Sequence, residues 1–135
     1  AALQARLDAV ELRGGMKGEL HVSGEDHLPP DIQDELYHIA QEALNNTLKH
    51  AHASQVDIYL SFSETFVKLQ ICDDGAGFNP ANLGRGGQGL AGMRERAQRI
   101  GSDLLVESTT GKGTKITVQT QLNSQARNKI LEERG

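Results

Sequence analysis

Residues 37–51, YHIAQEALNNTLKHA, form the stretch around which this chain is organised. If it is a helix, apolar or small side chains recur at the three-and-four spacing of one core-facing stripe: Leu36, Ala40, Ala43, Leu44, Thr47 and Leu48. A second set lies on a neighbouring face, at the edge of that stripe: Glu42, Asn46, Lys49 and His50. These polar groups can line a cleft or form a solvated helix face, and an asparagine in mid-helix slightly favours the cleft.

The composition limits the class of protein. A chain of 135 residues is the size of one domain with a single core. A net charge of −4 without a basic stripe argues against a nucleic-acid partner, and no apolar run is long enough to span a bilayer. A single cysteine, Cys72, excludes an internal disulfide and indicates a reducing compartment, so we expect a cytoplasmic location. Because the chain starts without Met, we expect a fragment or a processed chain.

Hydrophobic periodicity predicts the remaining elements. In residues 19–23, Leu20 and Val22 alternate with polar residues, which predicts a strand with a solvated His21 on its opposite face. Pro29-Pro30 predicts the start of the central helix, which should run to about His50. The other predicted elements are a helix in residues 1–13, strands near 56–62, 67–73, 104–109 and 115–122, and a helix from 87 to about 100.

Strand parity makes Asp73 informative. It projects to the same side as Val67, Leu69 and Ile71, toward the core, where an ionised carboxylate is costly unless donors meet it. Gly75 and Gly77 follow at once, so the chain turns and leaves a notch beside the carboxylate. An Asp-Asp-Gly turn at the end of a strand is common, and this motif by itself is a weak signal.

Glycines also precede the last helix. Residues 79–88 have no hydrophobic pattern and predict a flexible loop, after which Gly87 and Gly89 open the helix. A helix start bare of side chains exposes backbone N–H groups and predicts an anion site. The pattern is neither the dinucleotide-binding fingerprint nor a P-loop. In the last strand, Thr114 shares the parity of Ile116 and Val118 and should place a hydroxyl toward the core.

These motifs occur in an order that resembles a known superfamily. Glu-x-x-x-Asn in a helix, Asp-x-Gly-x-Gly after a strand, Gly-x-Gly at a helix start and Gly-Thr before a last strand are typical of the gyrase, Hsp90, histidine-kinase and MutL ATPases. QEALNN..KHA, DDG.GF, GL.GMRERA and GTKI are most similar to sensor histidine kinases of the nitrate-sensor type. The resemblance implies a Bergerat-type α/β (α+β) fold, a two-layer sandwich with a mixed sheet of about five strands and helices on one face.

The resemblance also implies roles for single residues. Asn46 would hold Mg²⁺, and Glu42 would orient the metal's water shell or act as a base. Asp73 would accept a hydrogen bond from the adenine amino group, with Thr114 supporting a water. The remaining residues that the resemblance places at the nucleotide are Lys49, His50, Gly75, Gly77, Phe78, Gly87, Gly89 and Leu90.

The expected function is therefore that of a histidine-kinase catalytic domain. It would bind Mg-ATP and transfer the γ-phosphoryl group to a histidine on a separate dimerisation and phosphoacceptor domain, with a response regulator downstream. None of the five histidines (His21, His27, His38, His50 and His52) lies in an acceptor context, so we expect the acceptor outside this chain. A longer kinase of this kind can be a membrane-anchored receptor of which this chain is the cytoplasmic part. Two alternatives remain open: a serine kinase of the anti-sigma-factor type, and a non-catalytic nucleotide-sensing domain. We expect residues 1–122 to form the ATP-binding domain and residues 123–135 a polar C-terminal tail.

Overall fold

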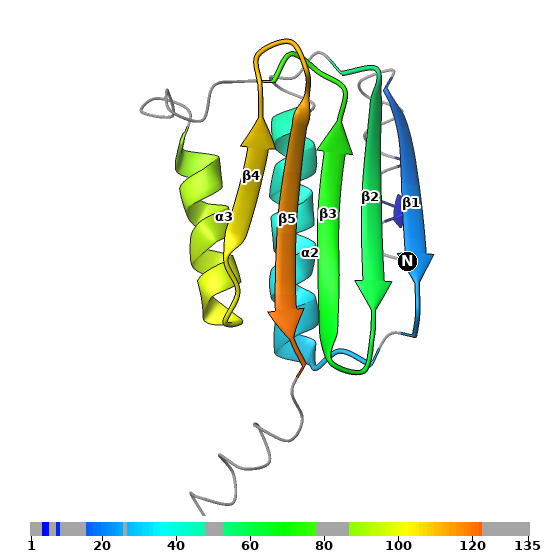
Figure 1. The fold of residues 1–135 in the computed structure, drawn as a ribbon, viewed down its shortest axis with the longest axis vertical. Helices are drawn as coiled ribbons and strands as arrows, with labels where there is room; N and C mark the ends of the chain where they lie inside the picture. Colours follow the sequence, from blue (N-terminus) through cyan, green and yellow to red (C-terminus); the bar gives the residue numbers. More distant parts are fainter. Residues whose placement is uncertain are drawn as a thin grey trace, which may run out of the picture.

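Helices α2 and α3 cover one face of a five-stranded sheet in the computed structural model of the chain (Figure 1). The structure describes residues 4, 5, 8, 16–25, 27–47, 53–77 and 87–122. The elements are β1 (Lys17–Ser23), α2 (Pro30–Asn46), β2 (Gln55–Phe62), β3 (Phe66–Asp73), α3 (Gly87–Arg99), β4 (Leu104–Ser108) and β5 (Thr114–Gln121). The predicted two-layer α/β sandwich is confirmed.

The sheet has the strand order β1-β2-β3-β5-β4 and is mixed, as predicted. β1 and β2 are parallel and are connected through α2, while the other three pairs are antiparallel. The short turn between β2 and β3 is held by the Ser63 hydroxyl, which accepts from the backbone N–H groups of Thr65 and Phe66. Only the β1–β2 pair therefore needs a helical crossover, since antiparallel neighbours can be joined by short turns.

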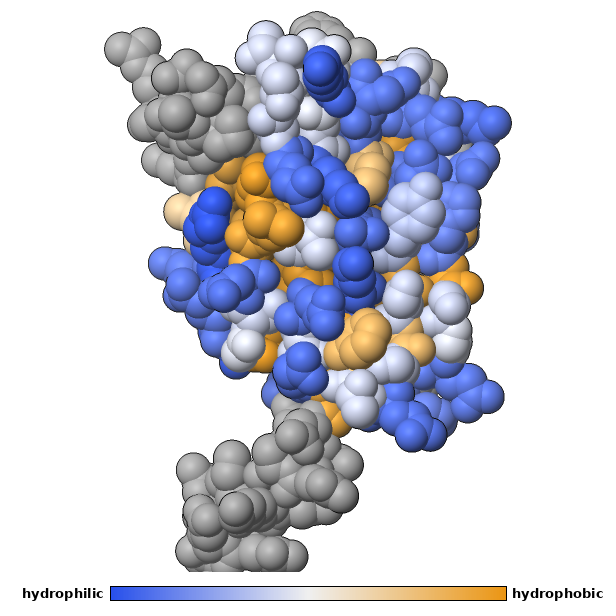
Figure 2. All heavy atoms as spheres, in the orientation of Figure 1, coloured by the Kyte–Doolittle hydropathy of each residue, from blue (hydrophilic) through white to orange (hydrophobic). Residues whose placement is uncertain are grey.

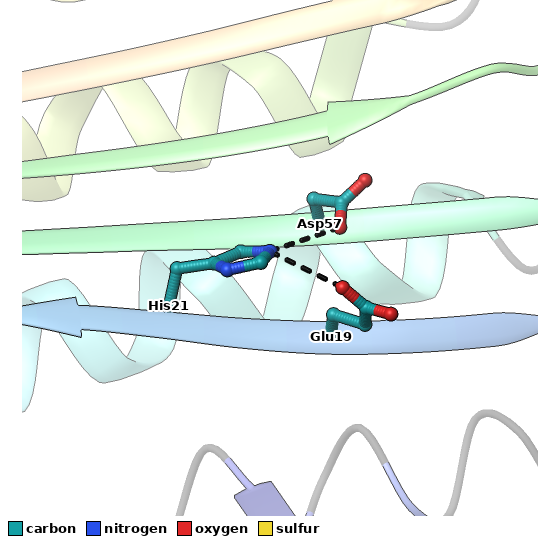
Figure 3. A group of neighbouring side chains, drawn as sticks. All are labelled: Glu19, His21 and Asp57. Carbon is teal, nitrogen blue, oxygen red and sulfur yellow. Dashed lines mark hydrogen bonds and ion pairs between the residues drawn. The ribbon is translucent and has the colours of Figure 1, made fainter.

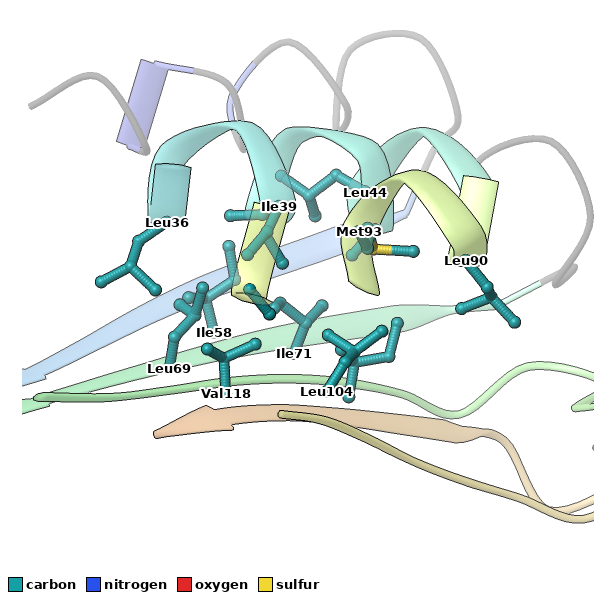
Figure 4. Close-up of a cluster of buried hydrophobic side chains, with 14 of the residues drawn as sticks. Leu36, Ile39, Leu44, Ile58, Leu69, Ile71, Leu90, Met93, Leu104 and Val118 are labelled. Carbon is teal, nitrogen blue, oxygen red and sulfur yellow. The ribbon is translucent and has the colours of Figure 1, made fainter. Parts of the chain in front are cut away.

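The core lies between the sheet and the two helices (Figure 4). The stripe predicted for α2 is confirmed at Leu36, Ala40, Ala43, Leu44 and Thr47, all of which are buried. The prediction missed Ile39, which is also fully buried and faces the sheet with Ile58 and Leu69 below it. Burial of each such aliphatic side chain contributes about 1.5–3 kcal/mol, so this layer anchors α2 firmly to the strands.

β1 corrects one expectation. Leu20 packs against the core, but Val22, which was predicted to share its inward face, has 56% of its surface exposed. β1 pairs only with β2 and forms one edge of the sheet, so few neighbours within the described part of the chain can cover its far end. His21 lies on the opposite face, as predicted, and is exposed.

The opposite face of the sheet is mostly hydrophilic, with an apolar patch over β4, where Leu105 is exposed (Figure 2). Cys72 lies on this face and is half-buried. Burial is the main cause that raises the pKa of its thiol, which disfavours the nucleophilic thiolate.

Several predictions fall outside the described residues: most of the first helix, the loop at 79–86, the tail at 123–135, and the site residues Lys49, His50 and Phe78. In the described ranges, no helix combines the length and the apolar character that crossing a membrane requires.

Candidate nucleotide-binding site

The motifs that the sequence singles out meet at one end of the molecule. Figure 1 shows that the C-terminal end of α2, the end of β3, the start of β5 and the N-terminal end of α3 all lie at the same end of the sandwich. Asp73 is the last residue of β3, and in the antiparallel register it stands opposite Thr114, the first residue of β5. Two polar residues from distant motifs are thus brought side by side.

Asp73 faces the helix layer, as strand parity predicts. Its Oδ2 lies 3.2 Å from the hydroxyl of Thr47, and its Oδ1 accepts from the backbone N–H of Gly75 at 2.9 Å. The Thr47 hydroxyl also lies 3.0 Å from the carbonyl oxygen of Ala43 in the last turn of α2. The carboxylate therefore has donors within the protein, which the sequence analysis left unidentified. A carboxylate has about four acceptor positions, so capacity for a further donor remains.

Thr114 is half-buried on the same side of the sheet. Its hydroxyl lies 2.9 Å from the hydroxyl of Ser108, which stands opposite it on β4 and also donates to the carbonyl of Gly113. Thr47 was predicted to be buried but not to contact Asp73, and Ser108 was not predicted at this site. Parity along β4 could have found Ser108, because Leu104, Val106 and Ser108 alternate onto the core face.

Two glycines allow the chain to close tightly here. Gly77 has a positive φ of 65°, and a Cβ on it would lie 2.2 Å from the carbonyl oxygen of Thr109. Gly113 has φ of 85°, and its Cβ would lie 2.1 Å from the backbone oxygen of Asp73. The turn after β3 thus packs against the β4–β5 turn, backbone on backbone. Gly75 and Gly77 were predicted to leave a notch beside the Asp73 carboxylate, and the structure adds a packing reason for Gly77.

The neighbouring Asp74 has a different task. Its carboxylate accepts from the backbone N–H groups of Ser54 at 2.9 Å and Gln55 at 3.0 Å, and from the Ser54 hydroxyl. The Ser54 hydroxyl is the main cause that lowers the pKa of Asp74, followed by the Gln55 N–H. Asp74 is exposed and fastens the start of β2, so only the first carboxylate of the Asp-Asp-Gly motif is directed inward.

Glu42 and Asn46 lie one turn apart on α2, and both are half-buried. Glu42 lines a groove between the two helices, whose lining residues are His38, Gln41, Glu42, Asn45, Gly92, Met93 and Arg96. Glu35 of α2 links the two helices, since its carboxylate accepts hydrogen bonds from Arg96 at 3.0 Å and from Arg99 at 3.5 Å, both on α3. Both residues are thus neither in the core nor fully solvated, but only Glu42 lines the groove, and the neighbouring Asn45 rather than Asn46 lines it too.

α3 begins at Gly87, as predicted, and has no acidic residue in its first turn and two arginines in its last. The side chain of Leu90 is buried in the core, so this residue can offer a ligand only its backbone. Unsatisfied N–H groups and the positive end of the helix dipole favour an anion at this end. The arrangement can therefore accept a ligand with a hydrogen-bond donor near Asp73 and negative charge near the start of α3.

Sequence comparison agrees with this arrangement. Residues 31–124 match the family described as "Histidine kinase-, DNA gyrase B-, and HSP90-like ATPase". The chain is 38% identical to the sensor protein VraS of Staphylococcus saprophyticus over 109 residues, which cover 81% of this chain and 31% of that protein. The VraS protein of Staphylococcus aureus is 38% identical over 98 residues, which cover 73% of this chain and 28% of the relative. The chain thus spans less than a third of the length of these sensor proteins.

Structural comparison supports the same fold. The histidine kinase domain of a blue-light activated histidine kinase from Erythrobacter litoralis superposes with a TM-score of 0.73 at 22% identity, over 93% of this chain and 61% of that one. At this identity the likeness concerns the fold. The match to the family model covers more than half of the chain and includes every motif from α2 to β5. This chain therefore belongs to the histidine kinase-, DNA gyrase B- and HSP90-like ATPases, a family that uses ATP.

Proposed function

We propose that this chain is the ATP-binding catalytic domain of a sensor histidine kinase. It binds Mg-ATP and transfers the γ-phosphoryl group to a histidine of a separate dimerisation and phosphoacceptor domain, and the phosphate then passes to a response regulator. The observation that carries the proposal is the position of Asp73. It combines an inward carboxylate, a neighbouring threonine in register and a close-packed glycine turn at the end of the molecule where α3 begins.

The base of ATP fits the donor and acceptor pattern at Asp73. The adenine amino group donates to the carboxylate, which keeps acceptor positions beyond those used by Thr47 and Gly75. Thr114 supports a water at the same place, and Gly75 and Gly77 leave backbone rather than side chains beside the base. A guanine base carries a carbonyl oxygen at the corresponding position, so the carboxylate disfavours it through repulsion between acceptors.

The phosphates of ATP would lie beside the N-terminal end of α3, at the same end of the domain as Asp73. The backbone N–H groups of Gly87, Gly89 and Leu90 at the start of α3 hold them, and the arginines stay at the far end of that helix. Asn46 would hold Mg²⁺ through its amide oxygen, and Glu42, one turn earlier, would bind the water shell of the ion. Both are oxygen ligands of the kind that Mg²⁺ takes while it keeps several waters. Lys49, His50 and Phe78 stay predictions, as does a domain bounded at residues 1 and 122.

The protein's part in the reaction is positioning and neutralisation of charge, because phosphoryl transfer needs little covalent chemistry from the enzyme. The partner domain supplies the nucleophilic imidazole. Such a partner is consistent with the sensor proteins being more than three times as long as the matched segment. We propose a cytoplasmic location, where ATP is available.

The deciding experiment offers the ATP-loaded chain a panel of phosphoacceptor domains from sensor kinases. The proposal expects phosphate on the acceptor that is labile in acid and stable in base, as phosphohistidine is. Acid-stable phosphate on serine would favour the anti-sigma-factor-type kinase. ATP binding without transfer to any acceptor would favour a nucleotide-sensing domain. Phosphate incorporated into this chain itself would contradict the expectation that the acceptor lies in a separate domain.

A further inference from the structure

A second cluster of polar side chains lies on the sheet face that α2 and α3 leave uncovered. Glu19 and His21 are two residues apart on β1, so they share this face, and Asp57 stands opposite Glu19 on the parallel strand β2 (Figure 3). All three project from the sheet side opposite to Asp73 and are separate from the proposed nucleotide site. The cluster is the one group of at least three histidine, cysteine or acidic side chains in the described residues that is close enough to hold a metal ion together.

The donor atoms converge on one point. His21 Nε2 lies 3.2 Å from Asp57 Oδ1 and 3.5 Å from Glu19 Oε2, and all three donor atoms lie within 4.8 Å of one another. A tetrahedral ion with bonds of about 2.0–2.1 Å holds its ligand atoms about 3.3–3.5 Å apart. The two distances from the imidazole already match this spacing. Glu19 can supply the remaining adjustment, since 44% of its side chain is exposed.

The surroundings orient these groups. The His21 ring stacks on Tyr59 with ring centroids 4.6 Å apart and 12° between the planes, which holds the imidazole so that Nε2 is directed at the carboxylates. The Gln55 amide donates to both oxygens of Asp57 at 3.2 and 3.3 Å. Hydrogen bonds of this kind to a metal ligand fix its orientation and raise its affinity for metal. β1 is paired with β2 along its whole length, so the site rests on rigid backbone.

The charge of the cluster favours a cation. Glu19 and Asp57 are direct partners in register, and like charges in that position repel each other. Lys17 compensates part of this charge from 3.7 Å, but it contacts Glu19 Oε1 and leaves Oε2 to His21.

We propose that Glu19, His21 and Asp57 form a binding site for a divalent transition-metal ion of the zinc class. One imidazole and two carboxylates suit Zn²⁺, Co²⁺ or Ni²⁺ better than Mg²⁺ or Ca²⁺, which take oxygen ligands. Three protein ligands leave at least one position open to water, as in sites that are not closed structural centres. This inference does not depend on the nucleotide-binding function, because the three ligands lie on the other face of the sheet.

The test titrates Co²⁺ and Zn²⁺ separately into the purified chain with excess Mg²⁺ present and no nucleotide. The binding heats and the visible absorption of bound Co²⁺ should show one site. His21→Gln should abolish that site. Gln55→Met, which removes only the donor to Asp57, should weaken binding by roughly tenfold, the lower end of the effect of an outer partner.

The chain offers a matched control. His27 is another exposed histidine beside a carboxylate, with Nε2 3.2 Å from Glu25 Oε2, but among the described residues no third ligand lies close enough to both. His27→Gln should therefore leave the Co²⁺ site unchanged, and circular dichroism should show that all variants keep the native fold. Absence of a Co²⁺ or Zn²⁺ site in the unaltered chain, or a site that survives His21→Gln, would overturn the proposal.

Discussion

Replacement of Asp73 by asparagine is the sharpest test of the proposed nucleotide site. The substitution is nearly isosteric, and the side-chain oxygen can still accept the Gly75 N–H that lies 2.9 Å from Oδ1. The Thr47 hydroxyl, 3.2 Å from Oδ2, can turn to accept from the new amide. A net contribution of about 0.5–1.5 kcal/mol per neutral hydrogen bond therefore limits the loss of folding stability.

The effect on ATP should be larger. The hydrogen bond from the adenine amino group to a carboxylate is charge-assisted and contributes about 1.5–3 kcal/mol. Its loss should weaken ATP binding by roughly 10- to 100-fold, since about 1.4 kcal/mol corresponds to one decade. Because an amide can donate to the guanine carbonyl, the preference of Asp73→Asn for ATP over GTP should also shrink.

The assay is calorimetric titration of ATP and GTP into the unaltered chain, Asp73→Asn and Asp74→Asn. The second variant is the matched control: it removes the adjacent carboxylate, which binds Ser54 and Gln55 rather than facing the helix layer. ATP affinity should be unchanged in Asp74→Asn. If Asp73→Asn bound ATP as tightly as the unaltered chain, Asp73 would be only a structural turn residue and the adenine pocket would lie elsewhere.

Three further predictions concern the metal, the glycine turn and pH. Asn46→Asp should leave the fold intact, as checked by circular dichroism, but should strongly reduce phosphoryl transfer to an acceptor domain. The reason is that it adds negative charge beside the phosphates and alters the Mg²⁺ site. Unchanged transfer would exclude Asn46 as a metal ligand. Gly113→Ala should lower the free energy of unfolding by about 1–3 kcal/mol more than Gly111→Ala, as measured by denaturant titration. Both glycines have a positive φ, but only a Cβ at Gly113 would meet a backbone oxygen, at 2.1 Å. Equal losses would mean that the left-handed backbone strain accounts for the whole effect. The pKa of Asp74 is lowered by Ser54, so its contribution to stability is present above the unfolded-state value and is lost as pH falls through the lower folded-state value. Asp74→Asn should therefore reduce the melting temperature slightly at neutral pH and not at pH well below 3.8, and a pH-independent difference would contradict this reasoning.

Local periodicity determined which way the important side chains face. The alternation in β3 put Asp73 with Val67, Leu69 and Ile71, and the structure confirms this through its contact with Thr47 of α2. The same rule placed Thr114 inward. The spacing of small and apolar residues similarly located the buried stripe of α2. These predictions succeed because successive side chains of a strand or helix are directed by backbone geometry that nearby residues establish.

Strand parity predicted the face of a side chain but did not always predict whether that side chain is buried. Val22 alternates with polar residues as Leu20 does, yet it is 56% exposed because β1 is an edge strand. Alternation assigns a side chain to a face of the sheet, but only the positions of neighbouring elements decide whether that face is covered there. Ile39 is the opposite case: it was left out of the predicted stripe and is fully buried, because the contact of α2 with the sheet is wider than a single row.

The sequence by itself therefore determined the elements from β1 to β5, the inward direction of Asp73 and Thr114 and, through the order of its motifs, the ATPase family. Tertiary structure decided which groups meet. Thr47 and Gly75 became the donors to Asp73, and Asp74 was directed to the start of β2. The parallel pairing of β1 with β2 brought His21 beside Asp57, 36 residues away. Contacts of this kind depend on strand order and register, which are set by packing of the whole core rather than by the residues around each site.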